Sequence, residues 1–199
     1  MSRKRLYIIA GCNGAGKTSA SRTILTEALK CKYFVNADEI AKRLAPDDVK
    51  SVAVRAGKIM LKQIDLLLAH RATFSIETTL ASRSYFKLIE RAHKLGYKVY
   101  LIFFWLNNPL LAIDRVKLRV AEGGHHVDSD VISRRYRMGI NNLFNIYMRL
   151  VDFWVIIDNS QLQRVSVAEG RNRSKNVTVH DMDRLKTMKR YGKNSNGRI

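Results

Sequence analysis

Short apolar runs alternate with longer amphipathic stretches along most of the chain. Apolar runs at residues 6–10, 33–36, 73–76, 97–106 and 152–157 are typical of buried strands. Between them, helical periodicity is found at 19–29, 49–70, 82–95, 110–121 and 129–150. One apolar face in 49–70, for example, is formed by Ala53, Ala56, Met60, Ile64 and Leu67 or Leu68. The alternation predicts an α/β fold, with a mainly parallel sheet flanked by helices.

The carboxyl-terminal region has a weaker pattern. Residues 163–169 and 176–180 predict two short strands of a hairpin, and 182–191 predict a terminal helix. Residues 192–199 are polar and are expected to fray. No internal repeat or proline-rich linker divides the chain, so we expect a single domain over 1–199.

A loop between the first predicted strand and helix carries a phosphate-binding motif. Residues 11–18, GCNGAGKT, fit G-x-x-x-x-G-K-[ST] in the strand–loop–helix context that this motif requires. Glycine lets the loop curl until its N–H groups converge on an anion. Lys17 is expected to reach the β- and γ-phosphates of ATP, and the Thr18 hydroxyl to bind Mg²⁺. The full predicted loop set is Gly11, Asn13, Gly14, Ala15, Gly16, Lys17, Thr18 and Ser19.

Polar residues also follow three other predicted strands. These are Asp38, Glu77 and the segment Asp158-Asn159-Ser160. Ligands of open parallel sheets bind at the carboxyl ends of strands, so we expect Asp38 to accept the proton of an acceptor hydroxyl and Glu77 to hold the acceptor or a Mg²⁺-bound water. Two alternatives stay open: Asp38 as a helix N-cap, and Glu77 as a buried acid satisfied by backbone N–H groups.

Arginines are concentrated in residues 115–137. Arg115 and Arg119 are four residues apart and share a helix face. After the loop 123–126, the next predicted helix begins with Arg134, Arg135 and Arg137. Two helical arms joined by a glycine-containing loop predict a small lid over 115–137 that delivers arginines to the phosphates. The alternative is a helical hairpin with solvated arginines.

Composition adds a strong positive charge. The chain has 36 Lys and Arg against 17 Asp and Glu, a formal net charge of +19, and its carboxyl-terminal extension, 161–199, is markedly basic. This charge favours anionic partners such as nucleotides, nucleic acid or an acidic protein. The longest apolar stretch, near 99–106, is far shorter than a membrane span, so no membrane association is expected. With no secretory signal pattern and two cysteines expected to be reduced, Cys12 and Cys31, the sequence predicts a cytoplasmic protein.

These motifs together resemble the zeta toxin family of P-loop kinases, particularly its shorter bacterial branch. The matching segments are 11–18, 36–41, 76–80, 115–127, 134–136 and 158–160. The resemblance implies an ATP-dependent kinase with a nucleoside-monophosphate-kinase-like core. Family members of known activity phosphorylate a hydroxyl of UDP-N-acetylglucosamine, and some are toxins silenced by a small antitoxin. An acidic antitoxin is therefore an implied partner of this basic chain.

The resemblance also implies roles for particular residues. Asp38 corresponds to the base for the acceptor hydroxyl, and Glu77 and Thr78 correspond to acceptor contacts. The γ-phosphate clamps correspond to Arg119 and one of Arg134 or Arg135. The implied catalytic set is Lys17, Asp38, Arg119 and Arg135, and the implied ATP site adds Arg115, Arg134 and, beside the adenine, Asn159.

Two other functions stay open from the sequence. The first is a kinase or NTPase directed at nucleic acid, which the charge of +19 and the basic extension would suit. The second is an ATP-binding interaction module with a weak active site in a toxin–antitoxin pair.

Overall fold

A seven-stranded sheet forms the centre of the molecule in the computed structural model, which describes residues 4–23, 29–172 and 176–193. The strand order is β2-β3-β1-β4-β5-β6-β7. The parallel strands are β1 (Arg5–Ala10), β2 (Tyr33–Val35), β3 (Phe74–Thr78), β4 (Lys98–Trp105) and β5 (Phe153–Asp158). The antiparallel hairpin β6 (Val165–Arg171) and β7 (Val177–Val179) extends one edge. The predicted α/β class and the carboxyl-terminal hairpin are confirmed.

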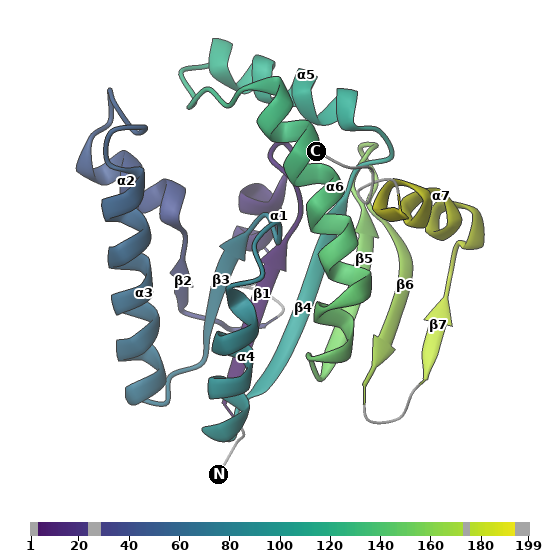
Figure 1. Cartoon of the computed structure of the whole chain (residues 1–199), viewed down its shortest axis with the longest axis horizontal. Helices are drawn as coiled ribbons and strands as arrows, with labels where there is room; N and C mark the ends of the chain where they lie inside the picture. The colour runs from purple at the N-terminus through teal and green to yellow at the C-terminus, as the bar shows by residue number, and fades with distance from the viewer. Residues whose placement is uncertain (1–3, 24–28, 173–175, 194–199) are drawn as a thin grey trace.

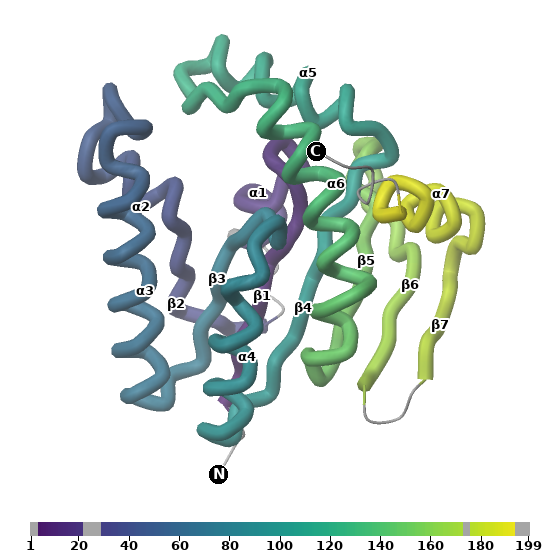
Figure 2. Tube along the Cα trace, in the orientation of Figure 1, coloured from purple at the N-terminus to yellow at the C-terminus, as the bar shows by residue number. Residues whose placement is uncertain are grey.

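Helices flank this sheet on both faces and at its edges. They are α1 (Lys17–Thr23), α2 (Ala37–Leu44), α3 (Ala53–Ala69), α4 (Tyr85–Lys94), α5 (Pro109–Ala121), α6 (Ser129–Asn145) and α7 (Met182–Lys193). In Figure 1, α4 and α6 lie in front of the sheet, α1 lies behind it, and α3 runs beside the edge strand β2. The Cα trace in Figure 2 follows α5 across the upper end of the sheet, where the parallel strands finish. Among the described residues, no helix combines the length and apolarity that a membrane span requires.

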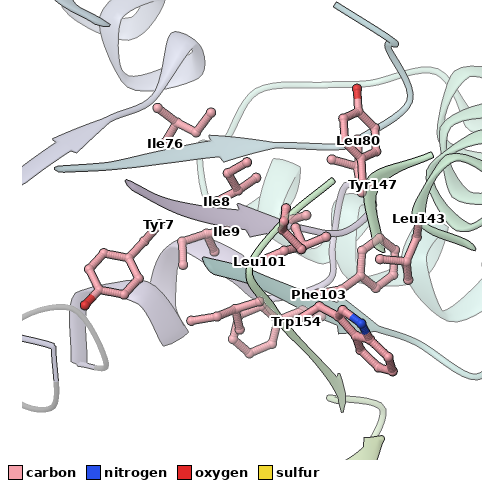
Figure 3. Close-up of a cluster of buried hydrophobic side chains, with 14 of the residues drawn as sticks. Tyr7, Ile8, Ile9, Ile76, Leu80, Leu101, Phe103, Leu143, Tyr147 and Trp154 are labelled. Atoms are coloured by element: carbon pink, nitrogen blue, oxygen red, sulfur yellow. The ribbon is translucent and has the colours of Figure 1, made fainter. Parts of the chain in front are cut away.

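The core lies where the central strands are covered on both faces. Every residue from Leu6 to Ala10 is buried, and so is every residue from Leu101 to Leu106, as continuous apolar runs in a covered parallel sheet require. Figure 3 shows these strands packing against side chains of α6 and its flanking segment, including Leu143 and Tyr147. The aromatic run Tyr100–Trp105 is therefore part of a buried central strand.

Two predicted helices are shorter in the structure. The helix predicted for 49–70 begins only at Ala53, as α3, because the chain after the end of α2 at Leu44 first forms a turn. The Asp48 carboxylate accepts a hydrogen bond from the Ser51 N–H at 3.2 Å, which holds the connecting turn. The buried face of α3 is as predicted at Ala56, Met60, Ile64 and Leu68, whereas Ala53 is exposed.

The predicted helix 129–150 also ends early. α6 stops at Asn145, and a short 3-10 helix, η2, covers Tyr147–Arg149. Ile146 leaves the helical region at φ −123°, which turns the fully buried Tyr147 into the core, where its hydroxyl donates to the Ser82 carbonyl at 2.5 Å. The predicted terminal helix is confirmed as α7. Part of the predicted helix 19–29 lies outside the described residues, and so does 194–199 of the end expected to fray. The expectation is wrong for Gly192 and Lys193, because both belong to α7 and Gly192 is buried.

Candidate active site

The phosphate-binding loop lies between β1 and α1, at the carboxyl edge of the sheet. Gly14 and Gly16 adopt φ of +77° and +74°, which other residues rarely adopt. A Cβ at Gly14 would lie 2.5 Å from the Ala112 carbonyl oxygen, and one at Gly16 would lie 2.5 Å from the Asn159 side-chain nitrogen. The loop is therefore packed tightly from behind, and glycine is required at both positions.

Lys17 and Thr18 meet Glu77 from the neighbouring strand. The Lys17 ammonium donates to the Cys12 carbonyl at 2.9 Å and lies 3.6 Å from one Glu77 oxygen. The Thr18 hydroxyl donates to the other Glu77 oxygen at 2.9 Å. Parallel pairing of β1 with β3 places Ile9 opposite Glu77 and so explains why residues distant in sequence meet. The alternative of Glu77 satisfied only by backbone N–H groups is therefore wrong.

Glu77 and Thr18 also present a donor set that suits Mg²⁺. Both groups are oxygen donors, and Mg²⁺ beside a nucleotide is commonly held by one or two protein oxygens together with phosphates and water. No group of three or more His, Cys, Asp or Glu side chains forms a complete metal site within the described residues. The residues present therefore fit a nucleotide-bound Mg²⁺ held partly by the protein.

Asp38 stands at the first turn of α2, after β2. The Asn36 carboxamide oxygen accepts from the N–H groups of Asp38 at 2.8 Å and Glu39 at 3.4 Å, so Asn36 is the N-cap. The alternative of Asp38 as the cap is therefore wrong. The Asp38 side chain is exposed and lines the cleft above the phosphate loop, where a carboxylate can meet an acceptor hydroxyl.

The two helical arms and the loop predicted for 115–137 are found as α5, the loop 122–128 and α6. These segments keep the name lid, and their closure over phosphates stays a prediction. Arg119 donates to the His125 carbonyl at 2.9 Å, across the base of the loop. Arg135 reaches down from α6 and donates to the Asn13 side-chain oxygen in the phosphate loop at 3.1 Å. Arg134 and Arg137 are exposed. Of the two arginines that the sequence left open, Arg135 is the one whose guanidinium contacts the phosphate loop.

The loop after β5 supports the phosphate loop from the other side. The Asn159 side-chain amide donates to the Ala15 carbonyl at 2.8 Å. Arg115 donates to the carbonyls of Asn159 at 2.8 Å and Ser160 at 2.9 Å. The Asp158 carboxylate accepts from Arg184 of α7 at 2.9 Å. The Asn159 side chain thus holds the phosphate loop in position. Its place beside the adenine stays a prediction.

A cleft of about 740 Å³ connects these elements. It is lined on the phosphate side by Asn13, Gly14, Gly16, Lys17, Thr18, Ser19, Arg115 and Arg119, and on the other side by Asn36, Asp38, Glu39, Lys42, Glu77 and residues 46–50. The sequence does not predict Lys42 or residues 46–50 as part of the site. The helix predicted for 49–70 includes Val49 and Lys50, whereas in the structure they belong to the loop before α3. Thr78 is buried, and its hydroxyl accepts from the Leu80 N–H at 3.0 Å, so it is turned toward its own loop.

A smaller hollow of about 280 Å³ continues under the lid. It brings Lys50 of the α2–α3 loop and His126 of the lid loop beside Asp38 and Arg135. A hydrogen bond from His126 and the charge of Lys50 lower the pKa of Asp128. Within the phosphate loop, burial raises the pKa of the Cys12 thiol to about 11. Cys12 is therefore protonated and adds no negative charge where phosphates would bind.

Comparisons with known proteins show the family and the fold of this chain. Residues 1–185 match the sequence model of the Zeta toxin family. An uncharacterized protein of Haemophilus influenzae is 27% identical over 143 residues, which cover 68% of this chain and 100% of that protein.

Two solved structures share the fold at low sequence identity. A chain of the AvrRxo1-ORF1:-ORF2 complex with ATP superposes with a TM-score of 0.74 at 16% identity, covering 94% of this chain and 63% of that one. A chain of the PezAT chromosomal toxin–antitoxin system of Streptococcus pneumoniae superposes with a TM-score of 0.68 at 17% identity, covering 100% and 89%. This chain therefore spans about two thirds of the AvrRxo1 chain and nearly the whole PezAT chain. The family model covers nearly the whole chain, so the chain belongs to the Zeta toxin family, and it has a P-loop kinase fold.

Proposed function

We propose that this protein is an ATP-dependent kinase that transfers the γ-phosphoryl group to a hydroxyl of a small molecule. The observation that carries the proposal is that one cleft is lined both by Lys17 and Thr18 of the phosphate loop and by the Asp38 carboxylate. A kinase needs both halves: a cradle for the migrating phosphoryl group and a carboxylate near the attacking oxygen.

The chain's own groups divide the chemistry between them. The backbone N–H groups of the loop and the Lys17 ammonium bind and orient the phosphates, and Mg²⁺ held beside Thr18 and Glu77 would offset their charge. Asp38 accepts the proton of the acceptor hydroxyl as its oxygen attacks phosphorus. Arg119 and Arg135, at the two ends of the lid, stabilise the charge on the transferring group when the lid closes.

The acceptor that family resemblance puts first is UDP-N-acetylglucosamine. The half of the cleft beyond Glu77 has room and hydrogen-bonding groups for a sugar, with Asn36, Lys42 and Lys50 among its lining residues. A toxin role fits the likeness to PezAT. An acidic antitoxin that covers the cleft would complement the charge of +19.

The test is transfer of labelled phosphate from ATP to UDP-N-acetylglucosamine in the presence of Mg²⁺, with Lys17→Ala as the blank. Asp38→Asn should lower kcat by about 10²-fold or more, because the proton acceptor is lost. Asp47→Asn removes the same charge from the same cleft and should leave kcat within a few-fold. Equal kcat values for Asp38→Asn and wild type would remove Asp38 from the mechanism.

The acceptor and the toxin role are separable in this design. If Mg·ATP binds but the sugar nucleotide stays unmodified, the acceptor assignment is wrong while the phosphate site stands. Growth arrest on expression of wild type, but not of Lys17→Ala, is the result expected of a toxin. Normal growth with both proteins would contradict that role.

A further inference from the structure

The helix α7 carries a row of cations on its outer side. Lys186, Lys189, Arg190 and Lys193 are all exposed, and their spacing places them within an arc of about 100°. The opposite side is apolar and buried at Leu185, Met188 and Gly192. Together with the exposed Arg137 of the neighbouring α6, these four residues are called the basic ridge.

The basic ridge is held in a fixed position by contacts between α7 and α6. The Tyr191 and Tyr136 rings meet edge to face with centroids 5.2 Å apart. The Asn141 amide donates to the Gly192 carbonyl at 2.9 Å, and Arg137 lies one turn before Asn141 on α6. Lys189 extends over the Phe144 ring at 5.7 Å. The cations therefore stand on a rigid two-helix support (Figure 1).

Few acidic groups offset the basic ridge. Asp183 lies 3.9 Å from Lys186, but both side chains are highly exposed, at 96% and 62%. Asp181 is engaged instead by Arg184, which faces the end of β5 and is not part of the ridge. An exposed pair such as Lys186 with Asp183 contributes little, so the surface keeps a strong positive potential.

We propose that the basic ridge binds the phosphodiester backbone of a nucleic acid, outside the kinase cleft. From Lys186 to Lys193 the helix rises about 10 Å, and a duplex carries about six phosphates along that length. None of the residues that line the cleft belongs to the ridge, within the described part of the chain. The site is therefore separate from the proposed phosphoryl transfer.

The chemistry of the ridge favours nucleic acid over other polyanions. Beside the ridge, Met182 at the start of α7 and Met138 next to Arg137 are the exposed large apolar side chains, and no aromatic side chain of α7 is exposed, whereas hot spots of protein interfaces are commonly aromatic. Insertion of a helix into a membrane surface needs an available apolar face, and that of α7 is buried. A row of cations without aromatic anchors suits binding to phosphate groups, and such contacts carry no sequence information.

The experiment measures fluorescence anisotropy of a labelled RNA hairpin, and of a DNA hairpin of the same sequence, over a salt series. Four to five phosphate contacts predict about 10²-fold weaker binding at ~200 mM than at ~50 mM salt. The ridge variant K186Q/K189Q/R190Q/K193Q should lose most of this affinity and most of the salt dependence. Comparison of the RNA and DNA hairpins shows whether the sugar matters.

A matched control removes the same charge elsewhere. The variant R55Q/K58Q/K62Q/K87Q alters exposed cations of α3 and α4 and should bind the hairpins nearly as wild type does. Equal losses in both variants would show binding by overall charge alone and overturn the proposal. So would absence of wild-type binding at ~50 mM salt, or displacement of RNA by polyglutamate at an equal concentration of charge.

Two further readouts keep the result interpretable. K186R/K189R/K193R preserves the charges and should restore binding. The thermal unfolding midpoint and Mg·ATP binding of the ridge variant should match wild type, because the ridge lies outside the cleft. The outcome is also independent of the kinase proposal: failed phosphoryl transfer with intact RNA binding, or the reverse, separates the two.

Discussion

At the residue scale, the pairing of Lys17 with Glu77 satisfies a buried positive charge. Lys17 is only 7% exposed, and an unpaired ammonium buried to that degree would be costly. Glu77 and the Cys12 carbonyl satisfy it in the structure described here. In the proposed kinase, phosphates would replace the carbonyl as partners of Lys17, and Glu77 would stay beside Thr18 to support Mg²⁺.

Glu77→Gln tests that role. The amide keeps the shape of the side chain but removes the negative charge beside Thr18, so the Mg²⁺ concentration for half-maximal transfer should rise by on the order of 10-fold. The measurement is a magnesium titration of phosphoryl transfer at saturating ATP. Glu90→Gln, at an exposed position on α4, is the matched control. An unchanged magnesium requirement in Glu77→Gln would remove Glu77 from the metal site.

At the element scale, the start of α2 determines where Asp38 stands. The Asn36 side chain caps the helix by accepting from two N–H groups, and Asp38 follows in the first turn. A carboxylate near a helix N-terminus is stabilised by the helix dipole. The orientation of the proposed base thus depends on the capping side chain of a neighbouring residue.

Asn36→Ala should therefore affect stability and activity together. Loss of the cap is expected to lower the free energy of unfolding by about 1 kcal/mol, and kcat should fall because α2 frays where Asp38 is held. Asn36→Ser restores a capping oxygen and should recover most of both quantities. Denaturant unfolding and the transfer assay provide the measurements. Full activity in Asn36→Ala would show that the cap does not position Asp38.

Two glycines that lie within helices, Gly139 and Gly57, differ in how closely other parts of the chain approach them. An added Cβ at Gly139 of α6 would lie 2.6 Å from the Thr79 carbonyl oxygen, whereas one at Gly57 of α3 meets nothing within 4 Å. Gly57→Ala should raise the free energy of unfolding by about 0.5–1 kcal/mol through helix propensity. Gly139→Ala should lower it, because α6 must move away from the loop after β3. The same sign in both variants would contradict this close approach.

At the scale of the whole molecule, a charged cluster fastens the edge of the sheet opposite the cleft. The Asp152 carboxylate accepts from the Lys98 ammonium, from the Val99 N–H at 3.0 Å and from His93 at 3.0 Å. Burial opposes ionisation of Asp152, but these hydrogen bonds outweigh it, so its pKa lies below the usual value of 3.8. The cluster joins the chain entering β4 to the chain entering β5.

The free energy of unfolding should depend on pH through Asp152. A lowered pKa means that the folded state binds fewer protons than the unfolded state, so this stabilisation is present above pH 3.8 and is lost as pH falls below it. Asp152→Asn should lower the free energy of unfolding at neutral pH by about 1–3 kcal/mol. It should also flatten the decline at acid pH. Asp114→Asn, at an exposed residue, should change stability by less than about 0.5 kcal/mol, and equal acid slopes in wild type and Asp152→Asn would contradict the assignment.

The strand–helix alternation, the phosphate loop and the two arginine-bearing helices α5 and α6 follow from the sequence alone. These features depend on local periodicity and on glycines whose backbone conformation is set within a few residues. The sequence also placed Asp38 and Glu77 at strand ends, and both line the cleft.

The pairing of these residues depends on the packing of strands and helices that are distant in sequence. Glu77 reaches Thr18 because β3 adds beside β1, and Arg135, not Arg134, reaches Asn13 because of how α6 crosses the sheet. Likewise, Tyr147 ends α6 because a core pocket accepts its ring. Such contacts join segments up to 122 residues apart, so no local pattern encodes them, and packing of the whole domain selects one partner among several chemically equivalent ones.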